Sequence, residues 1–220
     1  IGMLRKTISS KDFLNSSVPG YQIKDQIQII NSIKNFKNVE KIFYFFTLND
    51  IYGSSNVINT NTEQKKNEGN FKLKEINFIN DLNVYLRNKS YLFMLIKGLS
   101  TDPSKRWFFN LFSEYQNLNS DVIKENFINL RNVSEEMNVE FLVIILPYEY
   151  QTRNCNNDIL MPQKKISFIL EEVNVKYKNF TRFFCNSDNP NKNFYKFDPM
   201  HLSKKGHKLI HKLLIDEINF

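Results

Sequence analysis

Two dense apolar runs limit the folds that this chain can adopt. They are Lys41–Thr47 and Val139–Leu146, and neither alternates between polar and apolar side chains. A strand that is buried on both faces has this pattern, and such strands occur in parallel sheets covered by helices. Apolar residues at helical spacing occupy about 22–36, 120–137 and 162–173. This alternation of strands and helices predicts βαβ units, and therefore an α/β fold with a mostly parallel sheet.

Weaker patterns occupy the rest of the chain. Residues 1–10 resemble the end of a helix, Asp12–Asn15 a short strand and Val175–Phe184 a further strand. Residues 76–99 predict a helix. Residues 53–75 are rich in Asn, Lys and Glu, and we expect a mobile insertion there. No internal repeat is visible, so a single domain over the whole chain, 1–220, is predicted.

Composition narrows the classes of function. The 220 residues are 41% hydrophobic and 14% aromatic, which is typical of a globular chain. The net charge is +7, but the excess of Asn, Lys and Ile is also typical of an AT-rich genome. No dense stripe of Lys and Arg is interleaved with aromatic residues, so we expect no nucleic-acid partner. No apolar run reaches about eighteen residues, so we expect no membrane span.

The two cysteines, Cys155 and Cys185, do not have the spacing of a metal site. They indicate neither a zinc site nor a disulfide framework. A single bridge between them remains open if the protein is exported.

A motif near the C-terminus has the residue types of a proton-transfer site. Asp198 precedes His201 by three residues, and Ser203 is a natural N-cap for a closing amphipathic helix. A histidine can accept and return a proton near neutral pH, and a neighbouring carboxylate can orient its ring. Pro199 stiffens the link between the two residues. We therefore expect a reactive pair in the loop before the last helix.

The longer string Asp198-Pro-Met-His201-Leu-Ser-Lys-Lys-Gly-His resembles the last motif block of the SGNH/GDSL hydrolase family. The family's other blocks occur upstream in the same order. Asn-Ser-Ser-Val-Pro-Gly20 resembles the glycine block, and Thr47-Leu-Asn49-Asp resembles the asparagine block, with Thr47 where the family usually has glycine. The resemblance implies a three-layer α/β/α, flavodoxin-like fold. It also implies that Gly20 and Asn49 form an oxyanion hole, and that no cofactor or metal is required.

The family's first block, Gly-Asp-Ser at the end of the first strand, has no counterpart in this sequence. We therefore expect the first strand and the nucleophilic serine to be absent from this chain and to lie upstream of Ile1. In the family's sheet order, 2-1-3-4-5, that strand is an interior one. The chain alone should then be inactive and poorly stable.

In the intact protein the resemblance implies a serine-dependent hydrolase of ester bonds, with His201 as general base and Asp198 orienting it. The expected substrate is a small-molecule or carbohydrate ester. The loop with Tyr148 and Gln151 is expected to border the substrate site. An aromatic cluster over 107–112 is expected to form core or to line the same pocket.

Three alternatives stay open. The same fold could pass an acyl group to a sugar as an O-acyltransferase. It could be a non-catalytic binding module that lacks the serine. A metal site formed by His201, His207 and His211 is the third alternative, because the last two lie one helical turn apart. The sequence does not indicate the compartment or the oligomeric state.

Overall fold

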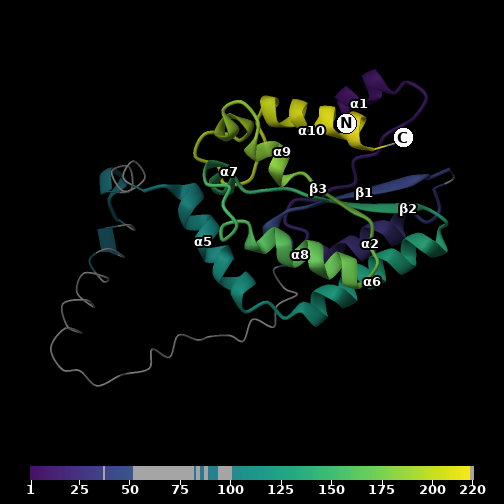
Figure 1. The fold of residues 1–220 in the computed structure, drawn as a ribbon, viewed down its shortest axis with the longest axis horizontal. Helices are drawn as coiled ribbons and strands as arrows, with labels where there is room; N and C mark the ends of the chain where they lie inside the picture. Colours follow the sequence, from purple (N-terminus) through teal and green to yellow (C-terminus); the bar gives the residue numbers. More distant parts are fainter. Residues whose placement is uncertain (37, 52–81, 83–84, 87–88, 94–100, 219–220) are drawn as a thin grey trace.

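The computed structural model contains one three-stranded parallel sheet flanked by helices (Figure 1). The strands are β1 (Lys41–Phe46), β2 (Glu140–Ile145) and β3 (Tyr177–Asn179), and they lie in the order β1-β2-β3. The structure describes residues 1–36, 38–51, 82, 85, 86, 89–93 and 101–218.

The central strand, β2, is apolar because both of its faces are covered. Its alternate side chains belong to two separate core clusters: Phe141, Val143 and Ile145 face one, and Leu142 and Ile144 face the other. β1 pairs with β2 over its full length, from Lys41 opposite Glu140 to Phe46 opposite Ile145. The predicted parallel pairing of these two strands is thus confirmed. Burial on both faces is confirmed for β2 but not for β1, which lies at the edge of the sheet and leaves Phe45 exposed.

The larger core cluster lies under four helices on one face of the sheet. These are α2 (Ile23–Ile33), α5 (Pro103–Gln116), α6 (Ser120–Glu136) and α8 (Met161–Glu172). Figure 1 shows α2, α6 and α8 below the sheet and α5 at its end. The helices predicted over 22–36, 120–137 and 162–173 are confirmed within a few residues at each end.

The second face is covered by the two ends of the chain. α10 (Lys204–Glu217) packs Ile210, Leu213 and Leu214 into the smaller cluster, and α1 (Gly2–Thr7) adds Leu4. Figure 1 shows α1 beside α10, with both termini above the sheet. Thr7 Oγ1 lies 2.9 Å from His211 Nε2, which joins the two helices directly.

Four short elements follow the carboxyl ends of the strands or lead into α10. The 3₁₀ helix η1 (Leu48–Ile51) follows β1, α7 (Glu149–Arg153) follows β2, and α9 (Thr181–Cys185) follows β3; a second 3₁₀ helix, η2 (Pro190–Asn193), precedes α10. Ligands of open parallel sheets bind at these carboxyl ends. A functional site is therefore expected at this end of the sheet.

Three predicted segments either differ from the structure or fall outside its described residues. The short strand expected at Asp12–Asn15 is wrong: these residues form no strand, and Phe13 instead packs against the smaller core cluster. The insertion expected over 53–75, and most of the helix expected over 76–99, lie outside the described residues. No helix in the described part is long and apolar enough to cross a bilayer.

Candidate functional site

The loop that holds Asp198 and His201 is fixed at both ends. Phe194 and Leu202 form an antiparallel bridge, and the Tyr195 N–H donates to the His201 carbonyl at 3.0 Å. Ser203 caps α10, as the sequence predicted, because its Oγ accepts hydrogen bonds from the N–H groups at the start of that helix. The loop is therefore a closed turn between η2 and α10.

Gly206 lets this turn sit close to η2. A β-carbon at Gly206 would lie 2.1 Å from the Asn193 carbonyl oxygen, which is far inside van der Waals contact. The same carbonyl accepts a hydrogen bond from the Ser203 N–H at 2.9 Å. The glycine of the sequence motif thus has a structural cause: only a residue without a side chain allows this approach.

Asp198 and His201 form a hydrogen-bonded pair. His201 Nδ1 lies 2.8 Å from Oδ2 and 3.0 Å from Oδ1 of Asp198, and the His201 N–H donates to Oδ1 at 2.9 Å. Partial burial acts to raise the pKa of Asp198. Backbone N–H groups of His201 and Met200, together with the imidazole, outweigh that effect and hold the pKa below its usual value.

The protonation pattern of the pair follows from this. An ionised carboxylate only accepts hydrogen bonds, so Nδ1 of His201 carries the proton. In the neutral ring the lone pair is then on Nε2. The His201 side chain is 70% exposed, so Nε2 is accessible to a substrate or a water. The geometry is that of a general base with an orienting carboxylate.

Asn49 lies in η1, directly after β1. Thr47 Oγ1 is 2.8 Å from Asn49 Oδ1, and the Tyr148 hydroxyl donates to the same oxygen at 3.0 Å. With Oδ1 held in this way, the amide presents Nδ2 as its donor, and no described residue accepts a hydrogen bond from it. A fixed side-chain amide with a spare N–H can stabilise a developing oxyanion.

The turn that carries Asn49 is organised by a buried acid, Asp50, whose role the sequence did not reveal. Asp50 accepts hydrogen bonds from the Thr47 N–H at 2.9 Å and from the Tyr44 hydroxyl at 3.0 Å. Burial raises the pKa of Asp50 to about 6, and these hydrogen bonds only partly oppose that shift. Burial, followed by the charge of Asp50, raises the pKa of Tyr44.

Tyr148 and Glu149 join the two motifs in space. The Glu149 N–H donates to the Pro199 carbonyl at 2.8 Å, inside the Asp198–His201 loop. The neighbouring Tyr148, which is buried, reaches Asn49 through its hydroxyl. The turn after β2 thus contacts both the C-terminal motif and the asparagine motif.

Gln151 is buried, and its side chain caps the start of α7. Its Oε1 accepts from the Tyr148 N–H at 2.9 Å, and its Nε2 donates to the Ile159 carbonyl and to Gln163. Tyr148 and Gln151 were both expected to border the substrate site. Both side chains are buried, Tyr148 bonded to Asn49 and Gln151 bonded to the Tyr148 backbone, and their part in substrate binding stays a prediction.

An ion-pair network anchors α7 on its outer side. Arg153 binds both carboxylate oxygens of Glu149, at 2.7 and 2.6 Å, and also binds Asp102 at the N-cap of α5. The hydrogen bonds that Arg153 donates to Glu149, only partly opposed by burial, raise the pKa of Arg153. The Arg153 guanidinium thus neutralises the charge of the buried Glu149 carboxylate. Its second contact, to Asp102, holds α7 against α5.

Gly20 has a left-handed backbone and no described link to the other site residues. Its φ of +83° is left-handed, and the Tyr21 N–H closes the turn on the Val18 carbonyl at 3.2 Å. Among the described residues, no hydrogen bond connects Gly20 with Asn49 or His201. Its part in an oxyanion hole stays a prediction.

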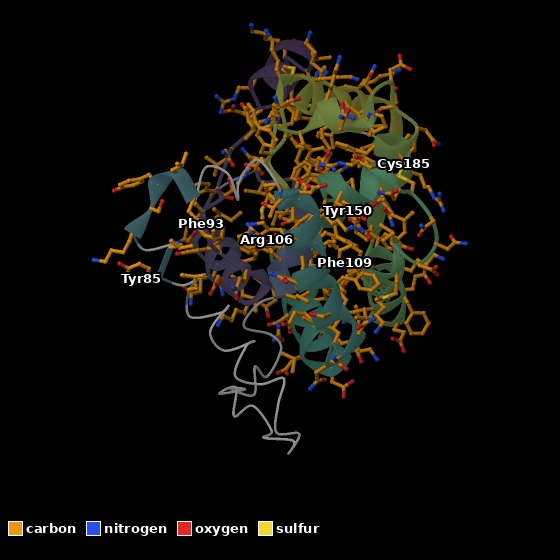
Figure 2. All side chains as sticks on the ribbon, turned by 90° about the vertical axis from the view of Figure 1, so that its left-hand side faces the viewer. Tyr85, Phe93, Arg106, Phe109, Tyr150 and Cys185 are labelled. Carbon is orange, nitrogen blue, oxygen red and sulfur yellow. A yellow bond between two sulfur atoms is a disulfide. The ribbon has the colours of Figure 1, made fainter. Side chains whose placement is uncertain are left out.

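The aromatic cluster of α5 contributes both to core and to surface. Phe108 is buried and stacks on Tyr150 of α7 at 5.4 Å, whereas Trp107 and Phe109 are exposed. Figure 2 shows Phe109 and Tyr150 on neighbouring elements, with Arg106 on the same helix. The predicted core role is confirmed for Phe108, and the predicted role in a substrate pocket is not tested.

A disulfide joins Cys155, just after α7, to Cys185 at the end of α9, with their Cα atoms 6.1 Å apart. Figure 2 labels Cys185 on this bridge. The sequence had left this pairing open. The bridge ties the turns after β2 and β3 to each other.

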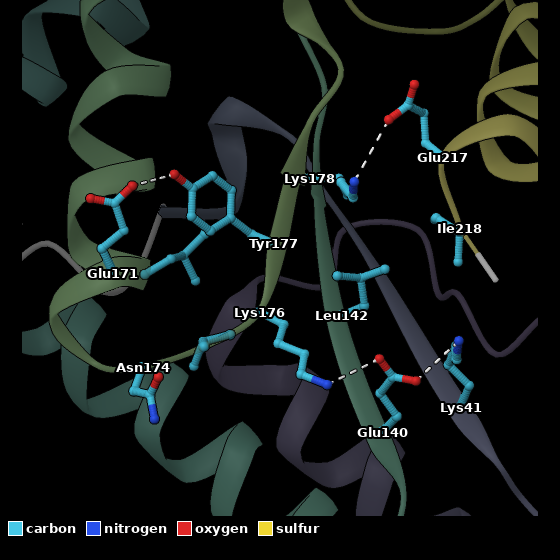
Figure 3. Close-up of a pocket in the computed structure, with 12 residues that line it drawn as sticks. Lys41, Glu140, Leu142, Glu171, Asn174, Lys176, Tyr177, Lys178, Glu217 and Ile218 are labelled. Carbon is cyan, nitrogen blue, oxygen red and sulfur yellow. Dashed lines mark hydrogen bonds and ion pairs between the residues drawn. The ribbon is translucent and has the colours of Figure 1, made fainter.

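A pocket of about 710 Å³ lies elsewhere, at the amino ends of the strands (Figure 3). Its charged side chains all have partners: Lys41 and Lys176 pair with Glu140, Lys178 pairs with Glu217, and Glu171 accepts a hydrogen bond from the Tyr177 hydroxyl. Asn49 and Tyr148 follow the opposite ends of the strands. The pocket is therefore separate from the candidate site.

Within the described residues, no three His, Cys, Asp or Glu side chains are grouped so that they could hold a metal ion. No described serine hydroxyl is hydrogen-bonded to His201. No protein family, curated protein or solved structure matches the chain.

Proposed function

We propose that this chain is part of a serine-dependent ester hydrolase of the SGNH/GDSL type. The observation that carries the proposal is the meeting of two distant motifs at one end of the sheet. The Asp198–His201 loop accepts a hydrogen bond from Glu149, and the adjacent Tyr148 holds Asn49. A base with its orienting carboxylate and a fixed amide donor are two of the three parts that acyl transfer requires.

The proposed fold is the three-layer α/β/α, flavodoxin-like arrangement of that family. The parallel order β1-β2-β3 agrees with the last three strands of its 2-1-3-4-5 sheet. In this interpretation a further strand lies beside β1 in the intact protein. The nucleophilic serine comes from outside the described residues, at the end of that strand.

The proposed reaction has two half-reactions, and His201 transfers the proton in both. The serine oxygen attacks the ester carbonyl while His201 Nε2 takes its proton, and Asp198 stabilises the imidazolium. Asn49 Nδ2 and the Gly20 N–H donate to the oxyanion. Collapse of the intermediate expels the alcohol, which receives the proton from His201. Water, activated by the same histidine, then releases the acid and restores the serine.

The test is hydrolysis of 4-nitrophenyl acetate by the protein expressed from its complete reading frame. We expect His201→Ala to lower kcat by at least about a thousandfold and Asn49→Ala by about a hundredfold. The matched control is His207→Ala, because His207 is an exposed histidine on α10, six residues after His201 and outside the proposed site. Near-wild-type turnover by His201→Ala would reject the proposal.

Product analysis separates hydrolysis from acyl transfer. Incubation with an acetylated donor and a sugar acceptor releases free acetate from a hydrolase, whereas an O-acyltransferase forms the acylated sugar. A binding module would give neither product and would leave the donor unchanged. We expect free acetate.

A further inference from the structure

An exposed aromatic and basic surface adjoins the Asp198–His201 pair. The Tyr195 and Phe197 side chains are 59% and 63% exposed, although both lie in the closed loop described above. Lys196 stands between them, with its Nζ 4.9 Å from the Phe197 ring centroid. We define the docking surface as these three residues together with the exposed Lys204 and Lys208 of α10.

This surface is continuous with the proposed catalytic pair. The Tyr195 N–H is bonded to the His201 carbonyl, and the Asp198 N–H closes the turn on the Tyr195 carbonyl at 3.0 Å. Phe197 has a left-handed φ of +66°, a conformation that a bulky residue rarely adopts. The loop thus holds a large apolar side chain in water directly beside Asp198.

The charge of the chain is concentrated at the same place. Residues 186–212 contain six lysines and two aspartates, and therefore more than half of the net charge of +7. One of the two aspartates, Asp198, is hydrogen-bonded to His201. On α10, Lys204, Lys208 and Lys212 are exposed at intervals of four residues, opposite the face that packs on the sheet.

We propose that this surface docks on an anionic lipid bilayer. Aromatic rings insert at the boundary between headgroups and acyl chains, and lysines beside them bind lipid phosphates. In that orientation His201 faces the lipid. The substrate class is therefore a lipid ester at the membrane surface. The docking is independent of catalysis, but this choice of substrate rests on the proposed esterase function.

A nucleic acid or an acidic polysaccharide fits the surface less well. The segment 186–212 contains no arginine, which is the residue that best forms paired hydrogen bonds to phosphate and carboxylate groups. Lysine acts as a point charge and suits a diffuse anionic surface. The exposed Phe197 ring adds an apolar contact that a bilayer satisfies.

Vesicle flotation tests the docking. The protein from the complete reading frame is mixed with vesicles of phosphatidylcholine alone or of phosphatidylcholine with phosphatidylglycerol, at low and at high salt. We expect it to bind only the anionic vesicles, and to bind them less at high salt. Lys204→Glu with Lys208→Glu should weaken binding by at least about 25-fold, since each lysine near such a surface contributes about fivefold.

The aromatic contribution has its own variant and a matched control. Phe197→Asn removes the ring and retains a residue type that tolerates left-handed backbone, so the loop should keep its shape. The control is Lys164→Glu with Phe168→Asn on α8, on the opposite face of the sheet, where Phe168 is 60% exposed. We expect Phe197→Asn to lose vesicle binding and the control to bind as the wild type does. Circular dichroism of each variant verifies that it is folded.

The outcomes separate the two proposals. No binding to anionic vesicles, or equal loss in the control, would overturn the docking even if a soluble ester is hydrolysed. Binding to dextran sulfate without binding to vesicles would overturn it in favour of a polyanion. Vesicle binding that depends on Phe197 and the two lysines supports the docking, whether or not any ester is cleaved. Faster cleavage of a phosphatidylglycerol ester in bilayers than of a soluble ester supports the substrate class.

Discussion

Replacing the buried Asp50 by asparagine should change how the stability of this protein depends on pH. Asp50 accepts hydrogen bonds from Thr47 and Tyr44 and shapes the turn that carries Asn49. Asparagine has the same shape and keeps an acceptor oxygen, but it is never charged. The comparison therefore isolates the free energy of ionising a carboxyl group inside this turn.

The direction and size of the effect follow from the pKa shift. Burial raises the pKa of Asp50 from 3.8 to about 6 in the folded protein. The folded state thus binds the proton more tightly than the unfolded state, and stability falls as pH rises between these two values. Between about pH 4.5 and about pH 7.5, linkage predicts a loss of about 2 kcal/mol for wild type relative to Asp50→Asn.

Urea denaturation across this pH range measures the effect as a difference between the two proteins. Asp198→Asn provides a control of opposite sign. The pKa of Asp198 is lowered in the folded state, so when the titration is extended to acid, below the ordinary value of 3.8, wild type should lose stability relative to that variant as the pH falls. If the difference between wild type and Asp50→Asn stays constant or grows in favour of wild type with rising pH, the argument that Asp50 ionises at a desolvation cost is refuted.

Three further predictions concern the framework of the site. Gly206→Ala should destabilise the protein by about 1–3 kcal/mol, because its β-carbon would overlap the Asn193 carbonyl oxygen. Gly2→Ala, with open space around it, should not destabilise it, and equal melting shifts for the two would contradict this. Tyr148→Phe removes the hydroxyl that donates a hydrogen bond to Asn49, and it should lower kcat of ester hydrolysis about 3–10-fold without raising KM. A change confined to KM would argue against the role of Tyr148 in positioning Asn49. Replacing both cysteines by serine opens a loop of 30 residues and should cost about 3–4 kcal/mol in urea denaturation, and an unchanged midpoint would show that the bridge does not contribute.

The strands and long helices could be predicted because burial leaves a direct pattern in the sequence. β2 is apolar on both faces, and α6 and α8 show apolar residues at helical spacing. Asp12–Asn15 could not be judged in this way, because Phe13 and Leu14 are its only apolar residues. Tertiary packing of Phe13 explains that pair without a strand.

The candidate site was predictable where chemistry and sequence are local. Asp198, His201 and the Ser203 cap lie within six residues, so their spacing already implied the observed hydrogen bonds. The link between Tyr148 and Asn49 spans 99 residues of sequence and follows from the alignment of β1 with β2. No local pattern indicated this contact.

The role of Asp50 and the exposure of Phe197 were also hidden. A carboxylate after a strand is usually solvated, and only the packing around Tyr44 shows that Asp50 is buried. Phenylalanine is usually interior, and only the left-handed backbone of the closed loop places it in water. Both features depend on the three-dimensional fold and leave no recognisable pattern in the sequence.

The most direct test of the central claim is covalent labelling with an alkyl fluorophosphonate, which reacts with a serine that a histidine has activated. The protein from the complete reading frame is treated, digested and analysed by mass spectrometry, beside His201→Ala. The account predicts one adduct, on a serine, in the wild type and its loss in the variant. No adduct in the wild type, or the same adduct in His201→Ala, would contradict a Ser-His-Asp mechanism that uses Asp198 and His201.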